Sequence, residues 1–151
     1  MFLNPNAMDF NLDITPKYLN LRSKGRFGEF VGVKAIEVKK GQVLCRLNIY
    51  PKLFASNGFL HAASIISLAD TTCGYGTIAH LPKNASNFTT IELKSNFLGT
   101  AKEGSLRCEA SPRHAGKMTQ VWDAAVVDEK NNREIALFRC TQMIIWPHFT
   151  S

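Results

Sequence analysis

The sequence contains neither a long uninterrupted apolar run nor a pair of cysteines at metal-site spacing. Its most apolar stretch is interrupted by His61, Asp70, Gly74 and Gly76, so it is not expected to cross a bilayer. The first 13 residues mix Asn, Asp and Pro with single apolar residues and lack the apolar core of a secretory signal. We therefore expect a cytoplasmic protein without a membrane partner.

The four cysteines are scattered along the chain, at Cys45, Cys73, Cys108 and Cys140. No two of them have the C-x-x-C spacing that is typical of zinc and redox sites. Because we expect a reducing compartment, the sequence predicts reduced and mostly buried thiols and no metal site.

The net charge of +6 is moderate and spread along the chain. It favours polyanionic partners such as nucleic acid, acidic lipid or a phosphate-bearing small molecule. The sequence has no arginine-rich arm, helix-turn-helix or RNP-like aromatic motif, so no nucleic-acid partner is predicted. A length of 151 residues suits one domain with a full core. We expect residues 1–26 to form an extension with a short helix and residues 27–151 to form that domain.

Apolar spacing predicts two strands, one long helix and then a run of antiparallel strands. A turn at 39–41 and a loop with one helical turn at 51–57 are expected before the helix, and Pro82 ends the helix. The predicted helix covers 61–80, and the predicted strands cover 27–37, 43–50, 89–97, 104–112, 117–128 and 134–146. This order is typical of an α+β fold in which a sheet curls around one helix.

Asp70 is the one ionisable acid within the predicted helix. It lies among Ile66, Leu68, Ala69 and Cys73, so the helix is apolar nearly all round and is expected to be enclosed. A carboxylate is costly to bury and is seldom kept there without a partner or a task. Asp70 is therefore the leading candidate for a reactive group, and the alternative is a solvated acid on a surface helix.

Two motifs around this acid resemble a known family. They are Gly58-Phe59-Leu60-His61-Ala62-Ala63 followed by Ser67-Leu68-Ala69-Asp70-Thr71, and the segment 89–98 with turns at 103–104 and 114–117. Over residues 27–146 the chain resembles the hotdog-fold acyl-CoA thioesterases of the PaaI-like and hydroxybenzoyl-CoA thioesterase branch. The resemblance implies a curved antiparallel sheet wrapped around one long central helix. It also implies that a homodimer, often paired into a tetramer, hydrolyses an acyl-CoA to free acid and CoA, with no cofactor besides the coenzyme A of the substrate.

The chain departs from the family pattern at two places. The two glycines that usually follow the histidine are replaced by Ala62 and Ala63, and the usual Asn falls on Ala55, with Asn57 two positions later. Either change can weaken carbonyl activation or alter substrate choice. Because alanine keeps its backbone N–H, we expect an intact oxyanion hole. The added methyl groups are expected to narrow the floor of the pocket.

Thioester hydrolysis needs a base or nucleophile and donors for the developing oxyanion. Asp70 can provide the first, and the free N–H groups at the helix start, near Ala62 and Ala63, can provide the second. Eight residues of helix separate Ala62 from Asp70, which is roughly 12 Å. One carbonyl cannot reach both within a chain, so we expect them to come from two subunits with antiparallel central helices.

Other motif positions receive roles through the resemblance. Thr90 is expected to help place substrate or water, or else to be an ordinary strand residue. His61 is expected to orient the loop before the helix or to cap the helix. Asn57 and Gly58, together with Ala63, are assigned to substrate binding.

The turn with Arg113, His114 and Lys117 corresponds to the nucleotide end of CoA in the family. Cationic side chains suit its phosphates, although a solvated basic turn is an equally simple reading. Four aromatic residues are candidates for an acyl pocket or for plain core: Phe54, Phe59, Tyr75 and Phe97.

The main alternative is a non-catalytic acyl-CoA-binding hotdog protein, which the changes at Ala55, Ala62 and Ala63 favour. A hydratase or dehydratase of this fold usually carries a catalytic His with an acid at another spacing, which is not found in the sequence. A nucleic-acid-binding module comes last.

Overall fold

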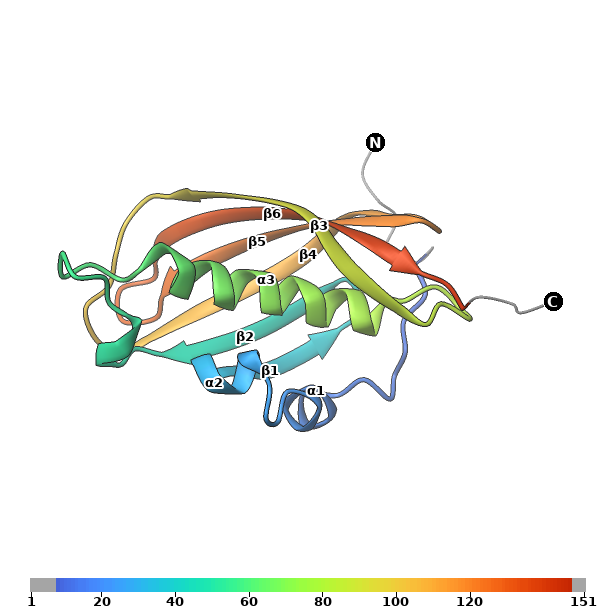
Figure 1. The fold of residues 1–151 in the computed structure, drawn as a ribbon, viewed down its shortest axis with the longest axis horizontal. Coiled ribbons are helices and arrows are strands. Elements are labelled where there is room, and N and C mark those ends of the chain that lie inside the picture. Colours follow the sequence, from blue (N-terminus) through green and yellow to red (C-terminus); the bar gives the residue numbers. More distant parts are fainter. Residues whose placement is uncertain (1–7, 148–151) are drawn as a thin grey trace.

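The computed structural model describes residues 8–147 as one curved antiparallel sheet with a long helix across one face (Figure 1). The six strands have the order β1-β2-β4-β5-β6-β3. The helical elements are α1 (Pro16–Arg22), α2 (Phe27–Val31), a 3-10 turn (Pro51–Leu53) and α3 (Ala62–Ala79), and the strands are β1 (Val33–Lys39), β2 (Gln42–Asn48), β3 (Asn87–Phe97), β4 (Ser105–Ala115), β5 (Thr119–Asp128) and β6 (Arg133–Ile145). The predicted α+β arrangement is confirmed. Among the described residues, no helix is long and apolar enough to cross a membrane.

The central helix α3 begins and ends where the sequence predicts. His61 is its N-cap, with an extended backbone and a ring Nδ1 that accepts a hydrogen bond from the Ala63 N–H at 3.0 Å. Gly76 allows the helix to approach the sheet closely, because a Cβ at this position would lie 2.6 Å from the ring of Trp122. A glycine inside a helix is usually unfavourable, and here packing against a buried tryptophan explains it.

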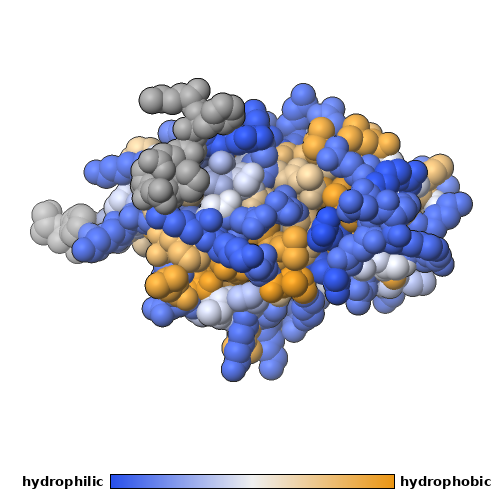
Figure 2. All heavy atoms as spheres, turned by 180° about the vertical axis from the view of Figure 1, so that it is seen from behind, coloured by the Kyte–Doolittle hydropathy of each residue, from blue (hydrophilic) through white to orange (hydrophobic). Residues whose placement is uncertain are grey.

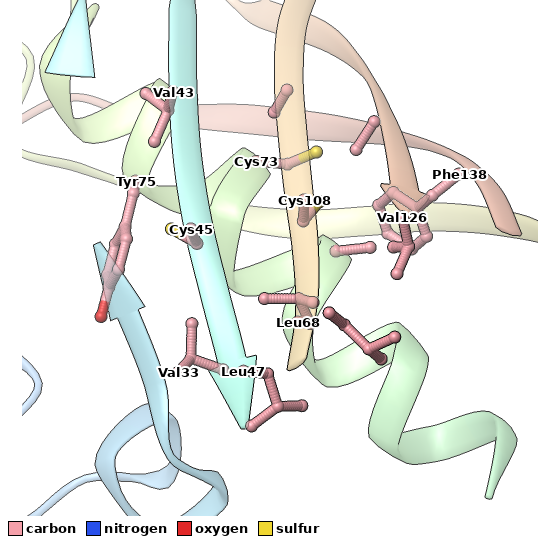
Figure 3. Close-up of a cluster of buried hydrophobic side chains, with 14 of the residues drawn as sticks. Val33, Val43, Cys45, Leu47, Leu68, Cys73, Tyr75, Cys108, Val126 and Phe138 are labelled. Atoms are coloured by element: carbon pink, nitrogen blue, oxygen red, sulfur yellow. The ribbon is translucent and has the colours of Figure 1, made fainter. Parts of the chain in front are cut away.

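The core between α3 and the sheet contains all four cysteines, which are free and buried, as predicted. Cys45 and Cys108 are opposite each other on β2 and β4, and Figure 3 shows them with Cys73 among aliphatic side chains. Burial raises the pKa of Cys45 to about 12, so this thiol stays protonated and packs as a small apolar group.

The prediction of a strand over 27–37 is wrong in its first half. Residues Phe27–Val31 form the short helix α2, which ends at Gly32 with a left-handed backbone (φ 95°). Such a glycine terminates a helix without steric cost, and β1 starts at the next residue. The apolar spacing of this segment reflects Val31 in the core, whereas Phe27 and Phe30 are exposed.

The N-terminal segment packs onto the same core, since Met8, Ile14 and Leu19 are buried in it. Asn20 lies beside the free edge of β1, where its side chain donates to the Ala35 carbonyl at 3.0 Å and accepts from the Ala35 N–H at 2.9 Å. No described strand covers the opposite edge, at β3. Residues 1–7 of the expected extension and 148–151 of the expected domain lie outside the described part, and the boundary at residue 26 stays a prediction.

Candidate active site

Asp70 lies half-buried on the side of α3 that faces β3. Its Oδ1 accepts a hydrogen bond from the Thr90 hydroxyl at 3.3 Å, whereas nothing within residues 8–147 donates to its other oxygen. Burial raises the pKa of the Asp70 carboxyl above its ordinary value, and the hydrogen bond from Thr90 opposes that rise. The site therefore holds a carboxylate with increased basicity and one oxygen open for chemistry.

Gln142 on β6 contacts Thr90 and was not identified from the sequence. It is fully buried. Its Oε1 accepts a hydrogen bond from the Thr90 hydroxyl at 2.9 Å, and its Nε2 donates to Cys140 Sγ at 3.2 Å. The one hydroxyl proton of Thr90 is therefore shared between two acceptors, Gln142 Oε1 and Asp70 Oδ1, and Gln142 holds this hydroxyl beside Asp70. The sequence did contain a signal for Gln142, since it is a polar residue at an inward-facing position of the otherwise apolar inner side of β6.

The start of α3 offers one open backbone donor. The Ala63 N–H is already bonded to His61, whereas the Ala62 N–H has no acceptor in the described part of the chain. Ala62 and Asp70 are separated by about 12 Å along the helix. They belong to one continuous helix, so one protomer does not bring them together.

An open groove of about 390 Å³ lies beside Ala62, between the start of α3 and the end of β3. Its lining includes Phe59, Leu60, Ala62, Ile65, Phe97 and Arg133. Of the four aromatic candidates for an acyl pocket, Phe59 and Phe97 line this groove. Tyr75 is instead buried beneath α2, with its hydroxyl toward Gly28.

Asn57 and Gly58 shape the turn before α3. The Asn57 side chain accepts a hydrogen bond from the Phe59 N–H at 3.2 Å, and Gly58 has a left-handed backbone with φ 83°. This turn places the groove residue Phe59 just before the helix. The side chain of Asn57 is thus already engaged by its own loop.

The basic turn lies at the opposite end of α3 from Ala62 (Figure 1). Arg113 forms an ion pair with Asp123 at 2.6 Å, and Lys117 lies 5.5 Å from the centre of the Trp146 ring. His114 is exposed. The turn joins β4 to β5. The side of the molecule that faces away from the viewer in Figure 1 is mostly hydrophilic, with separate hydrophobic patches (Figure 2). Within one protomer these residues therefore do not meet Asp70 or Ala62.

Thr90→Val tests the hydrogen bond to Asp70. The substitution removes the interaction that lowers the Asp70 pKa and leaves the desolvation that raises it. Because a base must be deprotonated, the acidic limb of the kcat/KM profile is expected to move to higher pH. Thr89→Val, at an exposed neighbouring position, is the control. An unchanged acidic limb in Thr90→Val would show that Asp70 does not control it.

Comparisons with known proteins agree on one family. A family model described as "Thioesterase superfamily" matches residues 57–135. The chain is 27% identical over 113 residues to 1,4-dihydroxy-2-naphthoyl-CoA hydrolase of Listeria monocytogenes, covering 75% of this chain and 90% of that protein. It is 28% identical over 110 residues to the acyl-coenzyme A thioesterase PaaI of Escherichia coli, covering 72% and 75%.

The solved structures agree on the fold. A thioesterase from Haemophilus influenzae superposes with a TM-score of 0.86 at 18% identity, covering 95% of this chain and 100% of that chain. The PaaI protein of Escherichia coli gives a TM-score of 0.75 at 21% identity, covering 86% and 91%. The expected hotdog fold is thereby confirmed.

Proposed function

Because the chain belongs to the thioesterase superfamily and is a thioester hydrolase, we propose that it hydrolyses acyl-CoA at a site shared by two subunits. Asp70 of one subunit is the general base or nucleophile, and the N–H of Ala62 of the partner subunit holds the oxyanion. The observation that carries the proposal is the half-buried Asp70, with one free oxygen and a raised pKa. Asp70 lies about 12 Å along its own helix from the open N–H of Ala62, so one carbonyl cannot contact both groups of the same subunit.

The uncovered edge of the sheet supports a two-fold dimer. β3 exposes Ile91 (54%), Leu93 (41%) and Phe97 (45%), and such apolar exposure along a bare strand edge is typical of a contact surface. Suppose that two β3 strands pair antiparallel about their middle. Thr90, in the first half of β3, then lies near the second half of the partner's β3. That half leads to Phe97 and the start of α3, so the pairing brings Asp70 toward the partner's open donor.

Hydrolysis breaks the bond between the carbonyl carbon and sulfur. As the base, Asp70 takes a proton from water while the hydroxyl adds to the carbonyl carbon, and the Ala62 N–H of the partner subunit donates to the oxyanion. Collapse of the intermediate expels the CoA thiolate, which takes up the proton from Asp70. As a nucleophile, Asp70 would form an anhydride that water then opens. Only the second route can transfer oxygen-18 from water to Asp70 in a single turnover.

The neighbouring helix end also acts on Asp70 itself. The positive end of the partner's α3 favours a nearby negative charge, so dimerisation would lower the pKa that burial raises. This effect would help to keep the carboxylate ionised inside an apolar site. Lys117, His114 and Arg113 stay candidates for the phosphates of CoA, and a tetramer and a cytoplasmic location stay predictions.

A non-catalytic acyl-CoA-binding protein is the second candidate. It is favoured by the use of the Ala63 N–H in the His61 cap, which leaves one oxyanion donor at the helix start. Thiol release from a panel of short, medium, long and aromatic acyl-CoAs separates the two functions. Turnover that Asp70→Asn abolishes supports the hydrolase, and saturable binding without turnover supports the alternative.

Mixed dimers test the shared site directly. Asp70→Asn and Ala62→Pro subunits are each expected to be nearly inactive, because every site in either homodimer lacks one group. In a mixed dimer one site has both groups intact and the other has neither. Unfolding and refolding an equal mixture should therefore restore about a quarter of the wild-type rate per subunit, because half of the dimers are mixed.

The control is the same mixture without unfolding and refolding, which keeps the subunits in their original pairs. If the refolded mixture is no more active than the separate variants, Asp70 and Ala62 do not act across subunits. A monomer in the active preparation would also contradict the proposal.

A further inference from the structure

The groove beside Ala62 is mostly apolar and has one charged side chain in its lining. Phe59, Leu60, Ile65 and Phe97 form its walls, and Arg133, the first residue of β6, is the one charged residue in its lining. The groove has about 390 Å³, which is within the usual range for small-ligand sites. Such sites combine apolar walls with a few polar groups that fix the orientation of the ligand.

Arg133 is held in place but has no acidic partner. Its Nη2 donates to the Thr100 carbonyl, and its guanidinium lies against Gly99, where a Cβ would be 3.6 Å from Cζ. No carboxylate within residues 8–147 lies within ion-pair distance of it. By contrast, Arg113 and Arg139 on the other face of the sheet share Asp123. Arg133 therefore keeps most of its five N–H donors available to a ligand.

The groove and the proposed reaction meet at Ala62, which belongs to both. A carbonyl bonded to the Ala62 N–H would have its acyl chain beside Phe59, Ile65 and Phe97. The start of α3, the end of β3 and the β5–β6 turn all lie at the same end of the molecule, at the left of Figure 1. A chain that follows the apolar walls from Ala62 thus encounters Arg133 as its one charged contact.

We propose that Arg133 selects acyl groups that are apolar in the middle and carry a carboxylate at the end far from the thioester. This inference rests on the proposed hydrolase function and names the substrate class of the same site. A planar guanidinium binds a carboxylate through two parallel hydrogen bonds, which a methyl end cannot replace. An acyl group without the carboxylate can still pack against the apolar walls. It is therefore a substrate too, but one that the enzyme does not prefer.

The test compares hexanoyl-CoA with adipoyl-CoA, which have the same chain length and differ in the terminal carboxylate. Wild-type protein is expected to prefer adipoyl-CoA in kcat/KM. Arg133→Gln is expected to reduce the ratio of adipoyl to hexanoyl kcat/KM by about 10- to 100-fold, as for loss of a hydrogen-bonded charge pair. Arg133→Lys should recover part of the ratio, because it keeps the charge and loses the two-pronged geometry.

Arg107→Gln is the matched control, because Arg107 contacts Asn132 on the other face of the sheet and is expected to leave the ratio unchanged. A wild-type preference for hexanoyl-CoA, or a ratio that Arg133→Gln does not change, overturns the selection by Arg133. Neither result affects the hydrolase proposal, which depends on turnover and on Asp70. If wild type hydrolyses neither ester, the same ratio is measured in Kd by calorimetry, and the hydrolase proposal fails only if the wider panel of acyl-CoAs is not hydrolysed either. Equal affinities for the two esters would then overturn this inference too.

Discussion

Asp70→Asn is expected to lower kcat for acyl-CoA by about 10²–10⁴-fold, which is the usual contribution of a positioned acid or base. The amide keeps the size of the side chain and can still accept the Thr90 hydrogen bond, but it cannot take a proton from water. The measurement is the rate of thiol release at saturating substrate. Asp70→Glu, which keeps the carboxylate at a different reach, should retain more activity than Asp70→Asn.

The same substitution is expected to preserve or increase the free energy of unfolding at neutral pH. Burial raises the pKa of Asp70 in the folded state, so folding disfavours the charged form. The resulting loss of stability sets in as pH rises through the ordinary pKa and is complete above the folded-state pKa. Asparagine carries no charge and avoids this loss. Urea unfolding at pH 7 measures it, and a large destabilisation together with lost activity would indicate a structural role for Asp70.

Ala62→Pro is expected to lower kcat by about 10²–10³-fold, which is typical for removal of one oxyanion donor. Proline removes the N–H of Ala62 without breaking a hydrogen bond, because that N–H has no acceptor in the described chain. The first position of a helix is where proline is best tolerated. His61 already has φ −64° and ψ 136°, which suits a residue before proline. The helix should therefore remain intact.

Ala62→Gly is the control for this variant, because it keeps the N–H and removes only the methyl group. It should retain activity and accept bulkier acyl groups, if the methyl narrows the pocket floor. Circular dichroism of Ala62→Pro checks that helical content is unchanged. Full activity in a folded Ala62→Pro protein would exclude the Ala62 N–H as the oxyanion donor.

Local patterns were sufficient to predict much of the fold. A helix from about 61 to 80 followed from continuous apolar character ended by Pro82, and the strands after it followed from a period of two. The prediction was wrong at 27–31, where apolar residues alone did not distinguish a short helix from a strand. Gly32 carried the missing signal, because a glycine after a helical turn is a common C-terminal stop.

The surroundings of the candidate site could not be predicted in the same way. Asp70 was identified because a carboxylate in an apolar helix is chemically conspicuous. Gln142 and Arg133 lie on β6, more than 60 residues further along the chain, and meet the site only because β6 pairs with β3 in the sheet. Strand order is a non-local property, so no local pattern places β6 next to β3. The cap by His61 was one of two readings of that residue from sequence, and the hydrogen bond to the Ala63 N–H confirms it.

The two margins of the sheet differ in what they leave unsatisfied. At β1 an amide side chain copies the hydrogen bonding of a missing strand, through Asn20 and Ala35, whereas β3 has no such substitute among the described residues. Strand addition at β1 would have to displace Asn20 from Ala35, whereas addition at β3 would displace no described side chain. This difference favours association through β3, and two copies that pair through β3 have both used that edge, which favours a closed pair over a fibre.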